Sequence, residues 1–429
     1  MDRTSGLSDD LILKILSFVP SKVAVATSLL SKRWRSLWKH VPKLCYFDPS
    51  IDSEFWRASR FVEKFLLLHN KAPVLDTLQL KVSRFCPPTD IETWVSIAVS
   101  RGVRNLVFYQ HRPCNTALSL PRSLFTCETL VTLKLHQANV VDVPLTICFR
   151  SLKRLYLTSV GFSSDKIFVR LLTGCPVLEG LVMAQCSYVT MTTFTIAVPS
   201  LKNLLVVNLN SLSKVPGDDF GLVIEAPSLK SLVIVSRLYW VCSLVKMPKL
   251  VFARIKIPHG DSRKLLGCLT SAKNLSLCVK QAVDSYPISV FCQLVSLKLC
   301  TCSSDWFRLI LKHTPKLRVL RFQHPEILLP SLANIRRYCS SYGDVQSQWE
   351  QPSSVPQCLV SSLETVEWID YEGTKAEKKV VMYLLENSRQ LKTVVIRALN
   401  SNTLEKRHKM LQELSSTQRS STKCRLSFI

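Results

Sequence analysis

The sequence predicts an α/β protein in which short parallel strands stack side by side behind a separate helical domain. Three observations support this fold class. A six-residue pattern of the form L-x-x-L-x-L recurs between Leu75 and Phe322. Residues 7–42 have helical periodicity instead, and the six-residue pattern returns twice near the end of the chain. The chain has 429 residues, of which 47% are hydrophobic, so it can fill a continuous core.

The repeated pattern is clearest at Leu130–Leu135 and Leu152–Leu157. Copies begin at residues 75, 103, 130, 152, 178, 201, 229, 250, 272, 294 and 317. The mean step of about 24 residues lies in the range of leucine-rich repeats, roughly 20–29 residues. One unit cannot bury its apolar face alone, so stacked units share a core and form a solenoid with a parallel β-sheet arc. The alternative, a set of unrelated Leu-rich strands or helices, does not account for the regular phase.

Residues 7–42 are predicted to form three short helices. Ser8 is a suitable cap for the first helix, which Pro20 ends. Ser21–Leu30 reads as the second helix, and Ser31 is expected to cap the third. Three helices of this size bury little surface, so we expect an apolar face that is shared with a partner.

The strings Leu7–Leu16 and Val23–Trp38 closely resemble the F-box of the large plant class of F-box proteins. Ser8 stands where that family usually has Pro. The resemblance implies docking on a Skp-family adapter and, through it, on cullin and RING subunits. The residues expected to divide between the domain core and the adapter interface are Leu7, Leu11, Ile15, Leu16, Val19, Trp34, Leu37 and Trp38. The alternative is a helical cap that only seals the end of the repeats.

The pattern breaks after Phe322 and returns at Leu363 and Leu391, with a helical pattern at Lys375–Leu385 between them. This end resembles the FBD domain, which follows leucine-rich repeats in plant F-box proteins. The predicted domains are therefore an F-box at 1–47, leucine-rich repeats at 48–337, a linker at 338–355 and an FBD-like domain at 356–429.

Composition narrows the function classes. The formal net charge of +25 would attract acidic partners, but the basic residues are scattered, which makes nucleic acid an unlikely main partner. The 16 Cys show no zinc-ligand spacing, so no metal or other cofactor is expected, and many are read as small buried residues. No signal peptide or membrane-spanning run is apparent, so the nucleus or cytoplasm is the expected location.

No catalytic constellation is apparent in the sequence. The eight His are dispersed, and no nucleophile motif accompanies them. Glu364 and Glu367 are three residues apart, which places them on opposite faces of a strand. The sequence therefore predicts a non-catalytic protein.

The function that the resemblance implies is a substrate receptor of a Skp-cullin-F-box ubiquitin ligase, with the target protein held by the repeats. The alternative is a leucine-rich-repeat scaffold or nucleic-acid-binding protein that acts without the ligase. The side chain at the fifth pattern position points away from the buried leucines. Along the stacked copies, this position holds a strip of mostly apolar residues with basic residues on either side. The candidate target-binding residues are Tyr156, Val182, Leu205, Val233, Arg254, Lys298 and Arg321. A loop or the FBD-like end could instead cover this strip.

Overall fold

The structure is a computed structural model that forms two compact units, Met1–Leu205 (unit 1) and Val206–Ile429 (unit 2). It describes residues 6–47, 55–69, 72, 74–83, 85–110, 120–140, 142–188, 193–208, 220–236, 240–244, 247–257, 262–279, 289–300, 310–323, 351–399 and 404–429. The boundary between the units falls inside a repeat strand. A stack in which each repeat contacts only its neighbours can divide at such a point.

The N-terminal domain of unit 1 is helical, as predicted. Its elements are α1 (Asp9–Phe18), α2 (Ser21–Ala26), η1 (Thr27–Leu29), α3 (Trp34–Leu37) and η2 (Trp38–His40). Ser8 caps α1, because its side-chain oxygen accepts from the Leu11 N–H at 3.4 Å. The prediction that Ser31 caps the third helix is wrong, since α3 begins at Trp34 with Arg33 at its cap. Arg33 instead pairs with Asp9 at 2.7 Å, which holds the turn before α3 against the start of α1.

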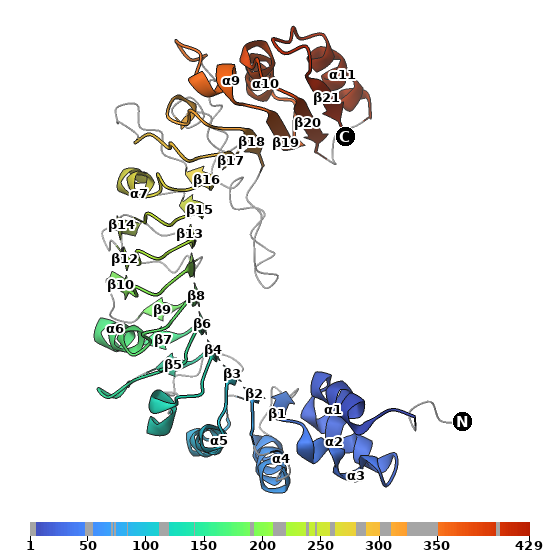
Figure 1. The fold of residues 1–429 in the computed structure, drawn as a ribbon, viewed down its shortest axis with the longest axis vertical. Coiled ribbons are helices and arrows are strands. Elements are labelled where there is room, and N and C mark those ends of the chain that lie inside the picture. Colours follow the sequence, from blue (N-terminus) through green and yellow to red (C-terminus); the bar gives the residue numbers. More distant parts are fainter. Residues whose placement is uncertain are drawn as a thin grey trace. The chain divides into compact units, whose positions relative to one another are not determined.

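The strands of unit 1 are parallel and follow the predicted phase, each beginning at the third position of its copy. Their order in the sheet is β1 (Lys43–Phe47), β2 (Thr77–Val82), β3 (Asn105–Gln110), β4 (Thr132–His136), β6 (Arg154–Thr158), β8 (Gly180–Ala184) and β11 (Asn203–Asn208), which carries the unit boundary (Figure 1). The strand β1 was not predicted. Val41, Leu44 and Tyr46 form an additional copy of the pattern, and all three are buried.

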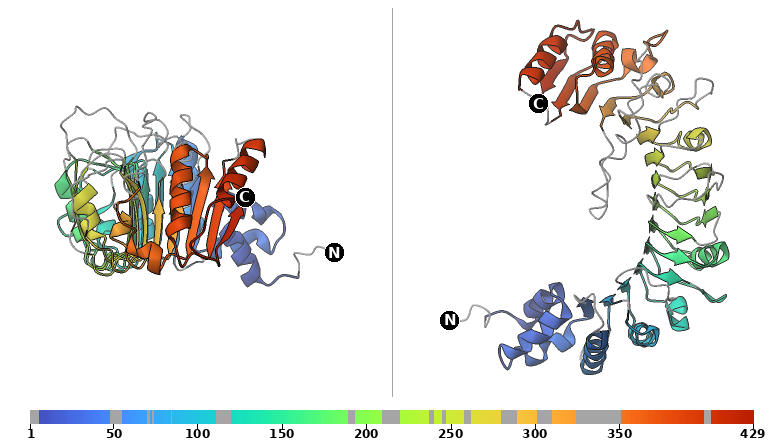
Figure 2. Two further views of the ribbon diagram at one scale, coloured as in Figure 1. Left: turned by 90° about the horizontal axis from the view of Figure 1, so that it is seen from above. Right: turned by 180° about the vertical axis from the view of Figure 1, so that it is seen from behind.

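Helices cover one side of the sheet of unit 1. They are α4 (Phe55–Leu68), α5 (Pro88–Ser100), η3 (Arg122–Thr126) and α6 (Asp165–Thr173), seen from two sides in Figures 1 and 2. Short strands complete this side, namely β5 (Asn139–Val140), β7 (Gly161–Phe162), β9 (Ser187–Tyr188) and β10 (Thr193–Ala197). Gly102 follows α5 with a φ of +70°, a conformation that suits the residue just after the end of a helix.

Unit 2 is also built from parallel strands in the repeat phase, and these include the strands of the FBD-like end. Its main strands, in sheet order, are β13 (Ser231–Ser236), β15 (Phe252–Ile257), β16 (Asn274–Val279), β17 (Ser296–Leu299), β18 (Val319–Phe322), β19 (Thr365–Tyr371), β20 (Thr393–Ala398) and β21 (Arg425–Phe428). Further strands β12 (Phe220–Glu225) and β14 (Trp240–Leu244) pair in parallel, and α7 spans Ser262–Cys268.

The FBD-like end adds helices to these strands. They are α9 (Gln357–Ser361), α10 (Lys375–Asn387) and α11 (Leu404–Ser415), drawn in orange and red beside β19–β21 (Figure 2). A capping box starts α10, with Thr374 and Glu377 each binding the other's backbone N–H. The predicted strand phase at Leu363 and Leu391 is confirmed. Most of the predicted linker, residues 338–350, lies outside the described residues.

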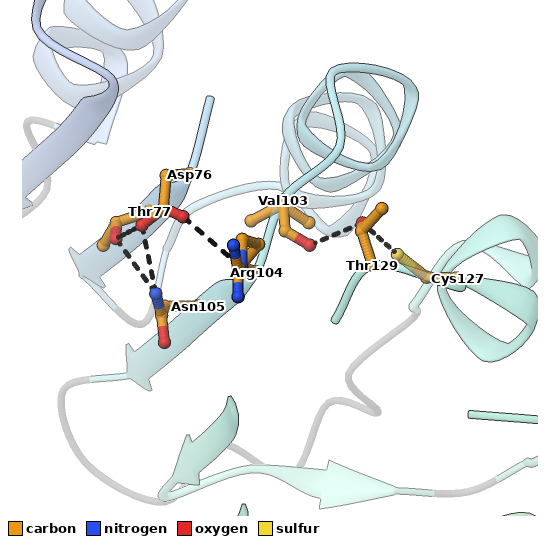
Figure 3. Close-up of polar contacts among 7 residues, drawn as sticks. All are labelled: Asp76, Thr77, Val103, Arg104, Asn105, Cys127 and Thr129. Carbon is orange, nitrogen blue, oxygen red and sulfur yellow. Dashed lines mark hydrogen bonds and ion pairs between the residues drawn. The ribbon is translucent and has the colours of Figure 1, made fainter. Parts of the chain in front are cut away.

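A recurring backbone contact sets the strand register. The carbonyl of the second pattern position accepts N–H groups from the second and third positions of the next copy. The Asp76 carbonyl, for example, accepts from the Arg104 and Asn105 N–H groups, each at 2.9 Å, and the Lys273 carbonyl accepts from Val295 and Ser296 at 2.9 and 3.1 Å. Figure 3 shows side chains adding to this contact, with the Asp76 carboxylate accepting from the Asn105 amide at 3.1 Å.

The fourth-position leucines form the core, as the repeat register predicted. Each is no more than 2% exposed: Leu133, Leu155, Leu181, Leu204, Leu232, Leu297 and Leu320. Their strand partners also match, since Leu133 lies opposite Leu155 and Leu297 opposite Leu320. The six-residue pattern therefore predicted both the inward face and the register.

A left-handed residue recurs at the end of three strands in unit 1. Gln137, Ser159 and Gln185 occupy the eighth position of their copies, with φ values of 54°, 52° and 53°. The N–H of Gln137 donates to Thr158 at 2.9 Å, and that of Ser159 donates to Ala184 at 2.7 Å. Because this conformation is uncommon for residues other than Gly, these neighbour contacts hold it in place.

Leu155→Ala and Leu297→Ala should each lower the free energy of unfolding by about 2–5 kcal/mol, because each leaves a cavity in a close-packed core. Urea unfolding measures this effect. Leu145→Ala is the matched control, since Leu145 is 83% exposed and should change stability by no more than about 0.5 kcal/mol. Unchanged midpoints for both core variants would show that the assigned register is wrong.

Candidate functional site

The helical domain divides its predicted adapter-binding residues between core and surface. Leu16, Leu37 and Trp38 are at most 6% exposed and therefore belong to the core. Leu11 and Ile15 are 50% and 47% exposed. The remaining three, Leu7, Val19 and Trp34, are partly exposed. Helical spacing alone could not separate these groups, because both lie along one broad apolar stripe.

Four further large apolar residues are exposed in this domain. Phe18, Leu29 and Leu30 are 77%, 88% and 70% exposed, and Val23 is 49% exposed. Phe18 and Leu29 do not lie on the apolar helix faces that the sequence predicts. They are therefore absent from the predicted adapter-binding residues. Together with Leu11 and Ile15 they form what we term the exposed apolar set. Large apolar side chains concentrated in so short a segment are typical of a protein contact.

The helical domain is fastened to the first strand of the repeats. The Ser21 hydroxyl accepts from the Cys45 N–H at 2.8 Å, and the Lys43 ammonium donates to the Ser17 carbonyl at 3.0 Å. Both contacts join α1–α2 to β1. A partner bound to the helices would therefore be held in a fixed position relative to β1.

His69 makes a further connection, between the end of the α4 segment and Val41, the residue that follows η2. Its Nε2 lies 2.6 Å from the Val41 carbonyl, and Arg101 lies 2.8 Å from its Nδ1. Because Arg101 can only donate, Nε2 carries the proton and donates to Val41. Burial lowers the pKa of His69, since the charged imidazolium would lose its hydration there. His69 therefore has a structural role, since it joins the α4 segment to Val41 and Arg101.

A pocket of about 370 Å³ lies between α2, η2 and α4. Trp38, Phe61 and Phe65 line it, and the ring centroid of Phe65 lies 5.3 Å from that of Trp38 and 6.0 Å from that of Phe61. Its full lining is Val25, Trp38, Trp56, Arg57, Arg60, Phe61, Lys64, Phe65 and Leu68. The lining contains three cations and no carboxylate, so the pocket suits an apolar group that lies next to an acidic one.

The sheet face of unit 1 carries the fifth-position residues in the predicted register. Lys134 lies opposite Tyr156, and Tyr156 lies opposite Val182. Tyr156, Val182 and Leu205 are all partly exposed. The Lys134 ammonium lies 4.6 Å from the Tyr156 ring centre, a cation–π distance. Unit 1 therefore brings three of the candidate target-binding residues to one accessible face.

The fifth-position residues of unit 2 give a different result. Val233 lies opposite Arg254, and Lys298 opposite Arg321, as the register predicted. However, Val233 is only 7% exposed, so it does not contribute an exposed apolar surface. Arg321 forms an ion pair with Glu367 of the next strand at 2.5 Å, so its charge is partly neutralised.

Comparison with known proteins supports the same organisation. The F-box domain model matches residues 5–46, and the FBD model matches residues 351–396. A model described as FBD-associated F-box protein At5g56370, LRR repeats, matches residues 91–278. The chain is 61% identical over 433 residues to the Arabidopsis thaliana FBD-associated F-box protein At5g56440, and the alignment covers 100% of both chains. The chain belongs to the FBD-associated F-box proteins.

A second relative is similar along its whole length. The chain is 39% identical over 436 residues to the F-box/FBD/LRR-repeat protein At5g56420 of the same plant, covering 100% of this chain and 99% of the relative. The predicted order of F-box, leucine-rich repeats and FBD is confirmed by these matches. The predicted boundaries at residues 47, 337 and 355 stay predictions.

F-box proteins are in general receptors or adapters rather than catalysts. Glu364 is bound by Lys392 at 3.0 Å, and its pKa is lowered mainly by that hydrogen bond. Burial raises the pKa of Cys175 and of Cys186 to about 12, which keeps both thiols protonated.

Within the ranges that the structure describes, no group of three or more His, Cys, Asp or Glu side chains could hold a metal ion. In those same ranges, none of the helices has the length and apolar content that a membrane span requires.

Acidification should destabilise this F-box protein partly through His69. Its pKa is lowered in the folded state, so below the unfolded value of about 6.5 the unfolded chain binds a proton that the native chain does not. This contribution is fully present above pH ~6.5 and is lost as the pH falls through the folded pKa. Urea midpoints at successive pH values should therefore fall less steeply for His69→Gln, which retains an N–H donor but does not titrate.

The matched control for this experiment is His408→Gln, since His408 is exposed on α11. That variant should keep the pH dependence of the parent chain. Equal pH slopes for His69→Gln and the parent would contradict the assigned role of His69.

Proposed function

We propose that this F-box protein is the substrate-receptor subunit of a Skp-cullin-F-box ubiquitin ligase. The helical domain would bind the Skp-family adapter, and through it the cullin and RING subunits, while the repeats hold a target protein. The observation that carries the proposal is the exposed apolar set on a domain whose own core is already complete. We also propose that it acts in the nucleus or cytoplasm.

The division of the helical domain between core and surface supports adapter binding. Ile12, Leu16, Leu37 and Trp38 pack its interior, so Phe18 and Leu29 are not needed to close it. Burying a large apolar side chain at an interface contributes roughly 1.5–3 kcal/mol. The exposed apolar set therefore supplies a favourable contact surface without weakening the fold.

The fixed connection between helices and sheet supports the receptor mechanism. The Ser21–Cys45 and Lys43–Ser17 hydrogen bonds hold the helical domain against β1, and His69 adds a bond to Val41. A target bound on the sheet of unit 1 would then keep a defined position relative to the docked adapter. Such positioning raises the effective concentration of the target beside the transferring subunit and requires no bond chemistry from the receptor.

For target binding we propose the fifth-position residues that remain accessible. In unit 1 these are Tyr156, Val182 and Leu205, and in unit 2 they are Arg254 and Lys298. Tyr and Arg are favoured at interface hot spots. Val233 and Arg321 are weaker candidates, because the first is buried and the second pairs with Glu367.

Phe18→Gln combined with Leu29→Gln should weaken capture of a purified Skp-family adapter by about tenfold or more, because even one hot-spot side chain typically contributes about 2 kcal/mol. Capture is measured by pull-down at equal protein concentration. Leu145→Gln is the control, since it exchanges the same type of exposed residue outside the helical domain.

Point variants are preferable to removal of residues 1–42 in this test. The deletion should abolish adapter capture, but it also removes Ser17, Ser21 and Val41, which bind the repeats. Undiminished capture by Phe18→Gln with Leu29→Gln would place the adapter surface elsewhere.

Two double variants test the target surface: Tyr156→Ala with Leu205→Ala in unit 1, and Arg254→Glu with Lys298→Glu in unit 2. Both should fold and retain the adapter, and both should lose ubiquitination of a target identified by mass spectrometry of trapped partners. If ubiquitination is unchanged in both, recognition lies on the helical side, in the loops or in residues 356–429. If the chain instead binds nucleic acid, with binding that weakens steeply between about 50 and 200 mM salt, the alternative function gains support.

A further inference from the structure

We propose that the sheet face of unit 1 binds an acidic, extended peptide segment through alternating cations and aromatic rings. The residues are Lys81, Tyr109, His136, Lys134 and Tyr156, termed here the cation–aromatic ladder. This inference rests on the proposed receptor function, because the acidic segment would belong to the target protein. It names the chemical class of target that the chain selects.

The ladder consists of two rows of neighbouring side chains on β2, β3, β4 and β6. In one row Lys81 lies opposite Tyr109, and Tyr109 lies opposite His136. The Lys81 ammonium is 5.0 Å from the Tyr109 ring centre, and the Tyr109 and His136 rings are 5.7 Å apart. In the other row the Lys134 ammonium is 4.6 Å from the ring of Tyr156. All five side chains are partly exposed.

No carboxylate lies among the outward-facing strand positions around the ladder. These positions hold Thr77, Gln79, Lys81, Asn105, Val107, Tyr109, Thr132, Lys134, His136, Arg154, Tyr156, Thr158, Gly180, Val182 and Ala184. Outward-facing cations without a carboxylate between them give this face a positive potential.

Two acidic residues at the strand entries, Asp76 and Glu179, are already paired. Asp76 accepts from Thr77 and Asn105, as Figure 3 shows, and it lies 3.8 Å from Arg104. Glu179 pairs with Lys202 at 2.9 Å. Within the described residues, by contrast, neither Lys81 nor Lys134 has a carboxylate partner. Their charges are therefore available to an acidic ligand.

The width of the four strands that carry the ladder suits a short extended peptide. Four neighbouring strands span three spacings of about 4.8 Å, roughly 14 Å, which equals about four residues of an extended chain at ~3.4 Å each. Acidic side chains could reach the lysines while the intervening residues pack on the rings and on Val107. Nucleic acid is less suitable, because its affinity depends on many phosphate contacts, about 6–10 in typical cases, and this ladder offers two lysines.

His136 adds hydrogen bonding at neutral pH and little charge. Its pKa is lowered by burial and by the neighbouring Lys134. Within the ladder, the charge that selects an acidic segment therefore lies on the two lysines, and the test is directed at them.

The experiment measures fluorescence anisotropy of a labelled peptide of alternating Glu and Ser with a central Leu, added to the full chain. A second peptide has Gln at every Glu position. The wild-type chain should bind the Glu peptide about tenfold or more tightly than the Gln peptide. Lys81→Glu with Lys134→Glu should abolish this preference, and Lys81→Gln with Lys134→Gln should reduce it.

The matched control is Arg122→Glu with Lys166→Glu, which makes the same change in net charge at exposed residues of η3 and α6 on the helical side. It should bind the Glu peptide within about twofold of wild type. Equal losses in the control and in the ladder variant would mean that net charge alone attracts the peptide, and this would overturn the proposal. So would absence of Glu-peptide binding to wild type, or a single-stranded oligonucleotide that binds more tightly and displaces the peptide.

Adapter capture is measured on the same preparations. If the ladder variant captures adapter but binds the Glu peptide like wild type, the ladder proposal fails while the receptor function stands. If wild type binds the peptide but captures no adapter, the receptor function fails and the peptide site remains.

Discussion

The carbonyl of the second pattern position, which accepts two N–H groups from the next repeat, determines how every other residue of the repeat is placed. Once the Asp76 carbonyl has bound Arg104 and Asn105, the following side chains must alternate between core and surface. Leu106 then points inward, and Val107 points outward. Since the contact uses only backbone atoms, the outward positions can vary without loss of register. Recognition chemistry can thus differ along the sheet while the fold is maintained.

Much of this arrangement could be predicted from the sequence. The spacing of the leucines determines which residues face the core, and the same spacing aligns each strand with the next one. The strands begin two residues after each pattern start, at Thr132 or Thr393 for example. The strand β1 was missed, since Val41 and Pro42 also read as the end of a helix. The short strands β5, β7 and β9 contain two residues each, which is too few for periodicity to show.

The surfaces were less predictable than the core, because they depend on contacts between distant parts of the sequence. Arg321 pairs with Glu367, 46 residues later, because β18 pairs directly with β19. The exposure of Phe18 and Leu29 depends on how α1, α2 and η1 pack, which helical spacing does not specify. The burial of Val233 likewise could not be read from its position in the pattern.

The buried cysteines affect how this F-box protein responds to oxidants. Reactivity requires the thiolate, and burial keeps Cys175, Cys186 and Cys358 protonated, with a pKa of about 12 for the first two and about 11 for the third. Sulfenic acid formation or unwanted crosslinking at these thiols would thus require a repeat to open first. Oxidation at these three positions would then follow the local opening of single repeats, and the closed repeats would protect them without any dedicated redox chemistry.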